Sequence, residues 1–328
     1  MPRWVAITGA GGYIGGMTAM RFRDMGYEVL GVDRNWKSAP WTRESVSIRS
    51  EGNFTDRAFL DMIHSLECEA VIHIAGTSLV GPSVMDPGIY YHNNVGETAV
   101  LLRELYMRGW EGPVVFSSSA AVYGSPVTSH PLQEDQAGQP CSPYGWSKWM
   151  AEQVLMDSAR AYGFGTVALR YFNACGADGG ARHGQVKNAT HIIARVMESF
   201  VNEQPFTLNG TDFDTPDGTC IRDYVHVEDL AQAHADAVAV AQSGTFQVFN
   251  LGTGTGYSNR QIIDTAERVV GRKLDLQIGP RREGDPARLI ADSRSFQKKT
   301  HWQPDHSSLE NIIETSWRWY TSSRYQTS

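Results

Sequence analysis

The sequence has no uninterrupted apolar segment of the length that spans a membrane, which takes about 20 residues. Basic residues are also in short supply, because 29 Lys and Arg stand against 36 Asp and Glu and leave a formal net charge of −7. This balance argues against nucleic acid or an anionic membrane as the main partner. A small anionic ligand is compatible with it only if arginines gather locally around that ligand.

Cysteine is scarce as well. The four cysteines (Cys68, Cys141, Cys175 and Cys220) show neither metal-ligand spacing nor the pattern of a disulfide framework. No secretion or transit signal precedes the first predicted strand. We therefore expect reduced, mostly structural cysteines, no metal site and a cytoplasmic protein.

The composition is that of a globular protein, with 41% hydrophobic and 20% charged residues in a chain of 328. This length suits one large domain or two coupled ones. In the first half, β-rich runs alternate with segments of helical periodicity, which is typical of a parallel sheet with right-handed crossovers. Strands are predicted at 4–8, 28–32, 46–48, 70–76, 113–116 and 166–171, and helices at 12–25, 55–66, 89–107 and 142–162.

The pattern becomes irregular after about residue 175. Loops are predicted at 176–184 and 209–217, helices at 189–201, 228–241 and 309–320, and a late strand at 246–251. We therefore predict an α/β fold in which a doubly wound parallel sheet, a Rossmann domain, occupies 1–177. A smaller C-terminal substrate-binding lobe is expected over 178–328, with 225–252 returning to the first domain.

A glycine-rich turn follows the first predicted strand, with Gly9, Gly12 and Gly15 in the spacing GxxGxxG. Such glycines allow a tight turn, close approach of the backbone to a pyrophosphate and close packing of helix on strand. The N–H groups at the start of the next helix would point at the phosphates. Asp33, at the end of the second strand, can bind both ribose hydroxyls and favours NAD over NADP, although the adjacent Arg34 could accept a 2′-phosphate.

A tyrosine–lysine pair lies in the helix predicted at 142–162, where Ser142 suits the N-cap and Pro143 the first helical position. Tyr144 and Lys148 are four residues apart and share one helix face. A nearby ammonium lowers the pKa of a tyrosine from its usual value of about 10, so the pair could take a proton from a substrate hydroxyl near neutral pH. Ordinary helices also contain tyrosine–lysine pairs at this spacing, so the pair alone does not indicate catalysis. A catalytic role would require the rest of the chain to bind a hydride acceptor beside it.

Two predicted strands end in small or polar residues at what should be the same edge of the sheet. Serines at 117–119 follow the strand at 113–116, and ligands bind at the carboxyl ends of strands in open α/β sheets. The strand at 70–76 is expected to end under the cofactor. Its His73 is interpreted as a hydrogen-bonded sheet residue rather than a catalytic one.

Seven motifs together resemble those of the extended short-chain dehydrogenase/reductase family, and the likeness covers nearly the whole chain. They are 8–15 (TGAGGYIG), 91–95 (YHNNV), 117–124 (SSSAAVYG), 142–148 (SPYGWSK), 169–173 (LRYFN), 217–227 (DGTCIRDYVHV) and 281–285 (RREGD).

The resemblance implies a role for each matching residue. Tyr144 would be the base, Lys148 its electrostatic partner and a ligand of the nicotinamide ribose, and Ser119 would bind the sugar 4-hydroxyl. Implied NAD-binding residues are Gly9, Gly12, Tyr13, Ile14, Gly15, Asp33, Asn53, Phe54, Ala75, Gly76, Asn94, Ser117, Tyr144, Lys148 and Tyr171. Implied substrate-binding residues are Ser119, Tyr144, Asn173, Asn188, Arg222, Arg282, Asp285 and Leu289. The two arginines would meet the pyrophosphate in bidentate fashion.

The implied activity is NAD-dependent epimerization at C4 of a UDP-hexose, UDP-glucose or UDP-galactose, through a transient 4-keto sugar. Related enzymes that eliminate water or decarboxylate carry acidic residues directly after the catalytic serine or threonine. Ala120 and Ala121 stand there in this chain and cannot transfer a proton. The resemblance also implies a homodimer formed through the helices at 89–107 and 142–162.

Departures from the family pattern leave alternatives open. Ser78 stands where the pattern has a lysine that contacts the cofactor, and Asn53 replaces an aspartate near the adenine. Leu289, at the position that controls sugar size, and the adjacent Arg288 leave a UDP-N-acetylhexosamine or a UDP-uronate open as substrate. Two further alternatives are a non-catalytic NAD-binding sensor or scaffold and an enzyme that releases NADH after a net oxidation.

Overall fold

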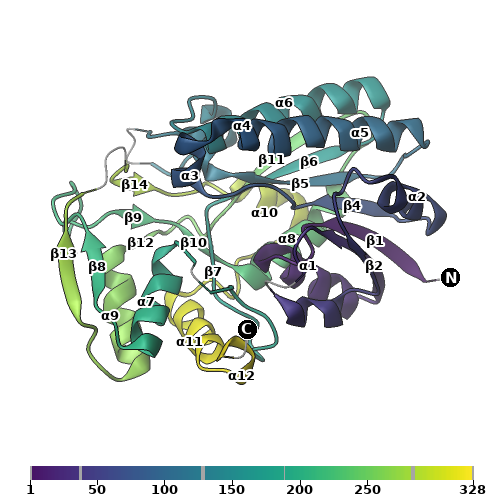
Figure 1. Ribbon diagram of the computed structural model, residues 1–328. Helices are drawn as coiled ribbons and strands as arrows, with labels where there is room; N and C mark the ends of the chain where they lie inside the picture. Colours follow the sequence, from purple (N-terminus) through teal and green to yellow (C-terminus); the bar gives the residue numbers. More distant parts are fainter. Residues whose placement is uncertain (1, 37–38, 127–129, 188, 282–284, 327–328) are drawn as a thin grey trace.

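The structure, a computed structural model, describes residues 2–36, 39–126, 130–187, 189–281 and 285–326. A seven-stranded parallel sheet lies at its centre, with helices on both faces (Figure 1). In spatial order its strands are β11 (Phe246–Leu251), β6 (Thr166–Tyr171), β5 (Val114–Ser119), β4 (Ala70–His73), β1 (Arg3–Thr8), β2 (Tyr27–Asp33) and β3 (Ile48–Glu51). The predicted doubly wound α/β fold is confirmed.

Successive residues of the inner strands are buried on opposite faces of the sheet, as β1 shows. Val5 and Ile7 join one apolar cluster, whereas Ala6 joins another, as the period of two in a strand requires. The first cluster is completed by α1 (Tyr13–Asp24), α8 (Val227–Val240) and α10 (Arg294–Thr300), and the second by α2 (Arg57–Ser65), α5 (Glu97–Met107) and α6 (Pro143–Tyr162). Because both faces are covered, inner strands such as β4 are buried along their whole length, whereas the edge strand β3 alternates between half-buried and exposed residues.

A smaller lobe at the lower left of Figure 1 has its own apolar cluster. Its helices are α7 (Ile192–Asn202), α9 (Asn259–Val270), α11 (Leu309–Tyr320) and α12 (Ser323–Gln326). Its strands form the pair β8 (Phe206–Asn209) and β13 (Leu276–Gly279), and the trio β12 (Tyr257–Ser258), β9 (Ile221–Arg222) and β14 (Arg288–Leu289). A further parallel pair consists of β7 (Asn173–Cys175), which comes directly after β6, and β10 (Tyr224–His226), which comes directly after β9.

The helix predicted at 89–107 is not regular. It consists of α4 (Pro87–Tyr91), a π-helical turn η2 (His92–Gly96) and α5. Within it, the Thr98 hydroxyl donates to the carbonyl oxygen of Asn94 (2.8 Å), and the Asn94 side chain bonds outside the helix. Such π turns are common at functional sites. Here the π turn places the Asn94 side chain beside Gly76 and Thr77, which follow β4.

Other elements were misplaced or missed by the sequence prediction. The third strand lies at 48–51 instead of 46–48, and the helix predicted at 189–201 begins at Ile192. The prediction lacked α3 (Val80–Met85), α9, α10, and the short helices η1 (Pro40–Ser45), η3 (Ala120–Tyr123) and η4 (Glu134–Gln136). Within the described residues, no helix has the length and apolar character that crossing a membrane would take.

Candidate functional site

The glycine-rich turn brings β1, α1 and the end of β4 into close contact. Gly9 has φ +72°, and a Cβ there would lie 2.8 Å from the backbone nitrogen of Ala75. A Cβ on Gly15 would lie only 1.9 Å from the carbonyl oxygen of Gly9. Gly12 is the N-cap of α1, so the free N–H groups of Tyr13 and Ile14 open at this turn. The turn therefore has the shape and the donors that a pyrophosphate needs.

Gly15→Ala is expected to lower the free energy of unfolding by about 1–3 kcal/mol and to weaken NAD binding, because the clash is with backbone and no rotamer change relieves it. Thermal unfolding and an NAD titration measure both effects. Gly81→Ala is the matched control, since a Cβ on Gly81 meets nothing within 4 Å. Equal stability of the two variants would contradict the close packing of α1 on the turn.

Asp33 lies at the end of β2 beside the glycine-rich turn. Its carboxylate accepts hydrogen bonds from the backbone N–H groups of Gly11 (3.0 Å) and Asn35 (2.8 Å). Each oxygen keeps a further lone pair for a ribose hydroxyl. The Arg34 guanidinium, in contrast, donates to the side chain of Asn93 (3.4 Å) on η2. The position therefore suits an unphosphorylated adenosine ribose.

Asn53 and Phe54 follow β3. The Asn53 side chain donates to Glu97 (2.7 Å), and the Phe54 ring is buried edge-on against His73, with 4.7 Å between the ring centroids. The Phe54 ring therefore faces the core, and any contact of this residue with an adenine would come from its backbone.

Asn94 lies between the end of β4 and the start of α6. Its side chain accepts from the Thr77 N–H (2.8 Å) and donates to the Ser147 hydroxyl (2.9 Å). A Cβ on Gly76 would lie 3.0 Å from the Asn94 side-chain oxygen and 3.4 Å from Lys148 Nζ. Gly76, Asn94 and Lys148 are therefore brought together, as a cofactor site at the strand ends requires. Ser78 lies just beyond, before α3.

Helix α6 begins as predicted. The Ser142 hydroxyl accepts from the Gly145 N–H (3.2 Å), and the helix ends at Gly163 with φ +88°. Lys148 is 3% exposed, and its ammonium donates to the carbonyl oxygen of Ser117 (2.8 Å) and lies 4.7 Å from the centre of the Phe116 ring. Burial lowers the pKa of Lys148 to about 8.

Tyr144 lies near Ser119, one helical turn before Lys148. The approach is close because Gly145 has no side chain, and a Cβ there would lie 2.6 Å from the carbonyl oxygen of Ala121. Ser119 caps η3, accepting from the Ala121 N–H (3.2 Å). Burial raises the pKa of the Tyr144 hydroxyl, and the interaction with the Ser119 side chain partly offsets this. The pKa decrease expected from the sequence is therefore not found.

Ser117 and Tyr171 lie on the neighbouring strands β5 and β6. The Tyr171 hydroxyl is hydrogen-bonded to the buried imidazole of His234, so its ring is held beneath the site. Burial raises the pKa of Tyr171, and its bond with the Ser117 side chain acts in the opposite direction. Ser117 therefore supports the site twice, because its carbonyl oxygen also holds Lys148.

The expected substrate residues come from three segments of the smaller lobe and its border. Leu289 pairs with Arg222 in adjacent strands, and the Arg222 guanidinium lies 3.7 Å from the Asp285 carboxylate. Asn173 donates to the carbonyl oxygen of Asp223 (2.7 Å), next to Arg222. Asn188 and Arg282 lie outside the described residues. The structure thus gathers four residues from three segments that are far apart in the sequence.

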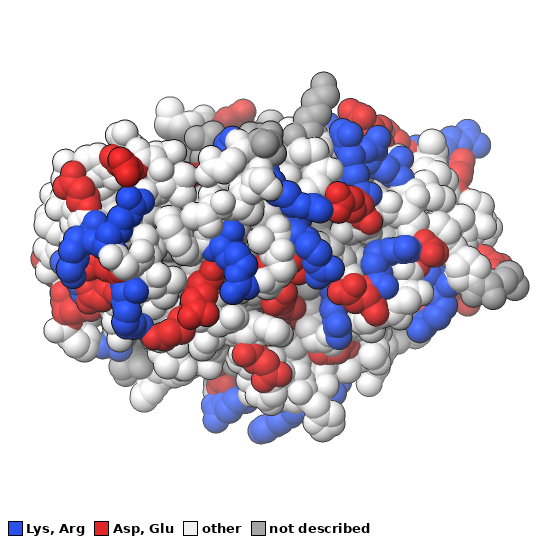
Figure 2. Space-filling model, turned by 90° about the horizontal axis from the view of Figure 1, so that it is seen from below, with Lys and Arg blue, Asp and Glu red and all other residues white. Residues whose placement is uncertain are grey.

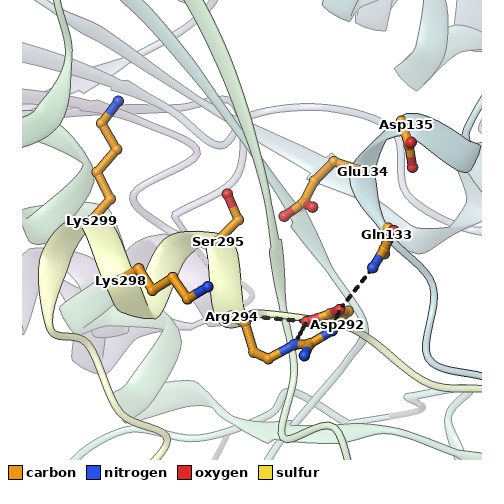
Figure 3. Close-up of a pocket in the computed structure, with 8 residues that line it drawn as sticks. All are labelled: Gln133, Glu134, Asp135, Asp292, Arg294, Ser295, Lys298 and Lys299. Atoms are coloured by element: carbon orange, nitrogen blue, oxygen red, sulfur yellow. Dashed lines mark hydrogen bonds and ion pairs between the residues drawn. The ribbon is translucent and has the colours of Figure 1, made fainter.

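A surface cleft of about 810 Å³ lies apart from these residues. Its lining residues are Gln133, Glu134, Asp135, Asp292, Arg294, Ser295, Lys298 and Lys299. Figure 3 shows Asp292 bonded to both Arg294 and Gln133, so one acidic and one basic residue of the lining are paired with each other. None of these described lining residues belongs to the predicted site. Among the residues the structure describes, no cluster of His, Cys, Asp or Glu could hold a metal ion.

Sequence reasoning missed several residues that shape the site. Ser147 and Thr77 hold Asn94, and Arg170 pairs with Glu152 directly behind the site, with 2.7 Å between Nη2 and Oε2. A buried arginine in an otherwise apolar strand was the one available signal, because such a charge needs a partner.

Comparison with known proteins places this geometry in a family. The profile of the NAD dependent epimerase/dehydratase family matches residues 5–252. A UDP-glucose 4-epimerase from Halalkalibacterium halodurans is 39% identical over 322 residues, which cover 96% of this chain and 95% of that protein.

Solved structures agree with the sequence relatives. The crystal structure of UDP-glucose 4-epimerase from Brucella ovis in complex with NAD is 39% identical, with a TM-score of 0.89 over 97% of this chain and 98% of that one. That of UDP-glucose 4-epimerase from Bifidobacterium longum in complex with NAD⁺ and UDP is 32% identical, with a TM-score of 0.88 and the same coverage. The chain therefore belongs to the NAD dependent epimerase/dehydratase family, a member of the extended short-chain dehydrogenase/reductase enzymes that its motifs resemble.

Proposed function

We propose that this protein is an NAD-dependent isomerase that inverts C4 of a UDP-hexose, interconverting UDP-glucose and UDP-galactose. One observation carries the proposal. Ser119, Tyr144 and Lys148 converge at the carboxyl edge of the parallel sheet, beside a turn suited to a dinucleotide. Relatives at up to 39% identity over nearly the full chain are UDP-glucose 4-epimerases, which supports the same reaction here.

The cofactor would be held by the residues around the glycine-rich turn. The α1 N-terminus would face the pyrophosphate, Asp33 the adenosine ribose, and Lys148 the nicotinamide ribose. When bound, NAD supplies the hydride acceptor and donor. A Ser in place of Lys at position 78 removes one positive charge from this side, so retention of NAD is expected to depend more on the turn and on Asp33.

The chain's own residues would move one proton and hold the sugar. Tyr144 takes the proton of the 4-hydroxyl and later returns it, while Ser119 positions that hydroxyl and Lys148 supplies positive charge nearby. Arg222 and Asp285 would hold the nucleotide, leaving the sugar of the 4-keto intermediate free to turn over. Ala120 and Ala121 offer no second proton-transfer group, which favours inversion over elimination or decarboxylation.

The test is conversion of UDP-galactose to UDP-glucose by the purified protein, with and without added NAD, followed by chromatography. We expect conversion without net NADH formation, and dependence on added NAD would report loose retention at the Ser78 position. Conversion of a UDP-N-acetylhexosamine or UDP-uronate alone would keep the mechanism and change the substrate, as Leu289 allows. Stoichiometric NADH would indicate a net oxidation. No turnover of any of these despite bound NAD would favour a sensor or scaffold.

A homodimer is also part of the proposal. Exposed apolar side chains gather on one outer face of the molecule, formed by α3 to α6 and the turn before them. They are Leu79, Val80, Val84, Met85, Ile89, Val100, Tyr106, Met107, Trp146 and Met150. A second copy of the chain would cover this face, because patches of this kind usually mark interfaces.

We further propose that 1–177 with 225–252 forms the NAD-binding domain and that the rest of 178–328 binds the nucleotide sugar. In support, β11 pairs with β6 in the central sheet and α8 packs on α1. A cytoplasmic location would suit a nucleotide-sugar enzyme. Figure 2 shows acidic and basic residues interspersed over one face, in keeping with a small-molecule substrate and with no role in binding nucleic acid or a membrane.

A further inference from the structure

His73 is the last residue of β4, just before Ala75 and Gly76 of the expected cofactor site, and it is surrounded by protein. It is 1% exposed, at the end of β4, between the rings of Phe54 and Phe116. Its Nδ1 lies 2.8 Å from the Thr8 hydroxyl oxygen, and its Nε2 lies 2.9 Å from that of Thr98. Both threonines are fully buried, so neither has water as an alternative partner.

The neighbours of the two threonines decide which ring nitrogen carries the proton. Thr98 donates to the carbonyl oxygen of Asn94 (2.8 Å), so its oxygen accepts from His73, and Nε2 must carry the hydrogen. Nδ1 then accepts from the Thr8 hydroxyl, whose oxygen accepts in turn from the Ala75 N–H (3.1 Å). In this arrangement the two hydroxyl hydrogens, the Nε2 hydrogen and the Ala75 N–H hydrogen each have an acceptor. The opposite tautomer would leave the hydroxyl hydrogen of Thr8 without one of these partners.

This series of hydrogen bonds joins three parts of the expected cofactor site. Thr8 precedes Gly9 of the glycine-rich turn, Ala75 precedes Gly76, and Asn94 is the residue that contacts Thr77 and Ser147. We propose that His73, as a neutral ring protonated at Nε2, is a positioning residue that fixes the glycine-rich turn, the end of β4 and the η2 turn relative to one another for NAD binding. The proposal rests on the proposed NAD-dependent function. Burial and the nearby Lys148 charge lower the pKa of His73 to about 3, so the ring stays neutral at physiological pH.

His73→Phe tests the proposal, because it keeps a buried ring between Phe54 and Phe116 and removes both hydrogen bonds. We expect NAD to bind about tenfold more weakly, since the two threonines lose their fixed partner, while affinity for UDP stays within about twofold of the wild type because the lobe is untouched. His226→Phe is the matched control. His226 is also buried and makes two hydrogen bonds, to Thr315 and to the Glu228 N–H, but contacts none of these three segments.

A second measurement reports the protonation of the ring in the wild type. Two-bond ¹H–¹⁵N correlation spectra of histidine-labelled protein assign the ring of His73 as the signal that is present in the wild type and missing in His73→Phe. That ring should be neutral and protonated at Nε2, should not titrate between about pH 5 and 9, and should be altered in Thr98→Val. If the signal that is lost in His73→Phe comes from a ring protonated at Nδ1, or from one that titrates in this range, the assignment is overturned. If the wild type binds NAD and His73→Phe binds it equally well, the positioning role is wrong, whereas a wild type that binds no NAD refutes the proposed function itself.

Discussion

Tyr144→Phe is expected to lower kcat for C4 inversion by about 10²- to 10⁴-fold, the usual contribution of a positioned general acid–base group. Phenylalanine keeps the ring, which packs edge-on against Tyr90 at 6.3 Å between centroids, and removes only the hydroxyl. The substrate's 4-hydroxyl then has no side chain of comparable reach to take its proton. Steady-state rates with UDP-galactose measure the loss, and calorimetry with UDP should show nearly unchanged affinity.

Tyr162→Phe is the matched control, because it makes the same chemical change on the same helix. Tyr162 lies at the far end of α6, where its ring stacks on Tyr106 at 4.5 Å. Its activity should equal that of the wild type. A Tyr144→Phe enzyme within tenfold of the wild type would remove Tyr144 as the base and would leave Ser119 as the next candidate to examine.

The protonation states of the base and its partner add a condition to this mechanism. Burial raises the pKa of Tyr144 and lowers that of Lys148 to about 8. At pH 7 Lys148 is therefore still mostly charged, whereas Tyr144 is neutral. Because a neutral phenol is a poor base, the mechanism depends on the charged form of Lys148, whose ammonium favours the phenolate of Tyr144.

The helix of the base was predicted from the sequence almost residue by residue, because its signals are local. Ser142 caps it, Pro143 occupies its first position and Gly163 ends it in the left-handed conformation. The turn with Gly9 and Gly15 was predictable for a similar reason, since glycine spacing reports a backbone contact directly. Asp33 followed from its place at the end of a strand.

Features that depend on distant partners could not be predicted in the same way. The side chain of Asn94, in the π turn, is bound by Thr77 and Ser147 from two other segments, and no local sequence signal indicates these contacts. The role of His73 depends on Thr8 and Thr98, and nothing in the sequence near His73 announces either partner. Substrate residues such as Arg222 and Leu289 came only from the family resemblance, because two-residue strands such as β9 and β14 leave no periodic signal.

Arg170→Met is expected to lower the free energy of unfolding by about 3–5 kcal/mol, a large part of the 5–15 kcal/mol typical of a folded domain. Arg170 is 2% and Glu152 is 1% exposed, and the pair is bidentate, with 3.0 Å from Nε to Oε1 and 2.7 Å from Nη2 to Oε2. Without the guanidinium, the Glu152 carboxylate stays buried and keeps the hydrogen bond from the Ser118 hydroxyl, but it loses the positive charge that balanced it. Denaturant unfolding measures the loss.

Two further variants separate a buried unpaired charge from the general cost of removing an arginine. Arg268→Met breaks an exposed pair with Glu310, in which both side chains are 59% exposed, and should cost at most about 1 kcal/mol. Removing both buried charges, in Arg170→Met with Glu152→Met, should recover much of the stability lost in Arg170→Met, since no unpaired charge is then left. A double variant as unstable as the sum of its two single variants would contradict this account.

The pair also connects stability to catalysis. Glu152 lies one helical turn after Lys148 on α6, and Ser118, which donates to Glu152, directly precedes Ser119 on β5. Arg170 extends the connection through its bonds to the Tyr123 hydroxyl (3.0 Å) and to the carbonyl oxygen of Glu134 (2.7 Å). Arg170→Met should therefore lower kcat even at temperatures where the protein is fully folded, because the strand that carries Ser119 and the helix that carries Tyr144 are no longer fixed to each other.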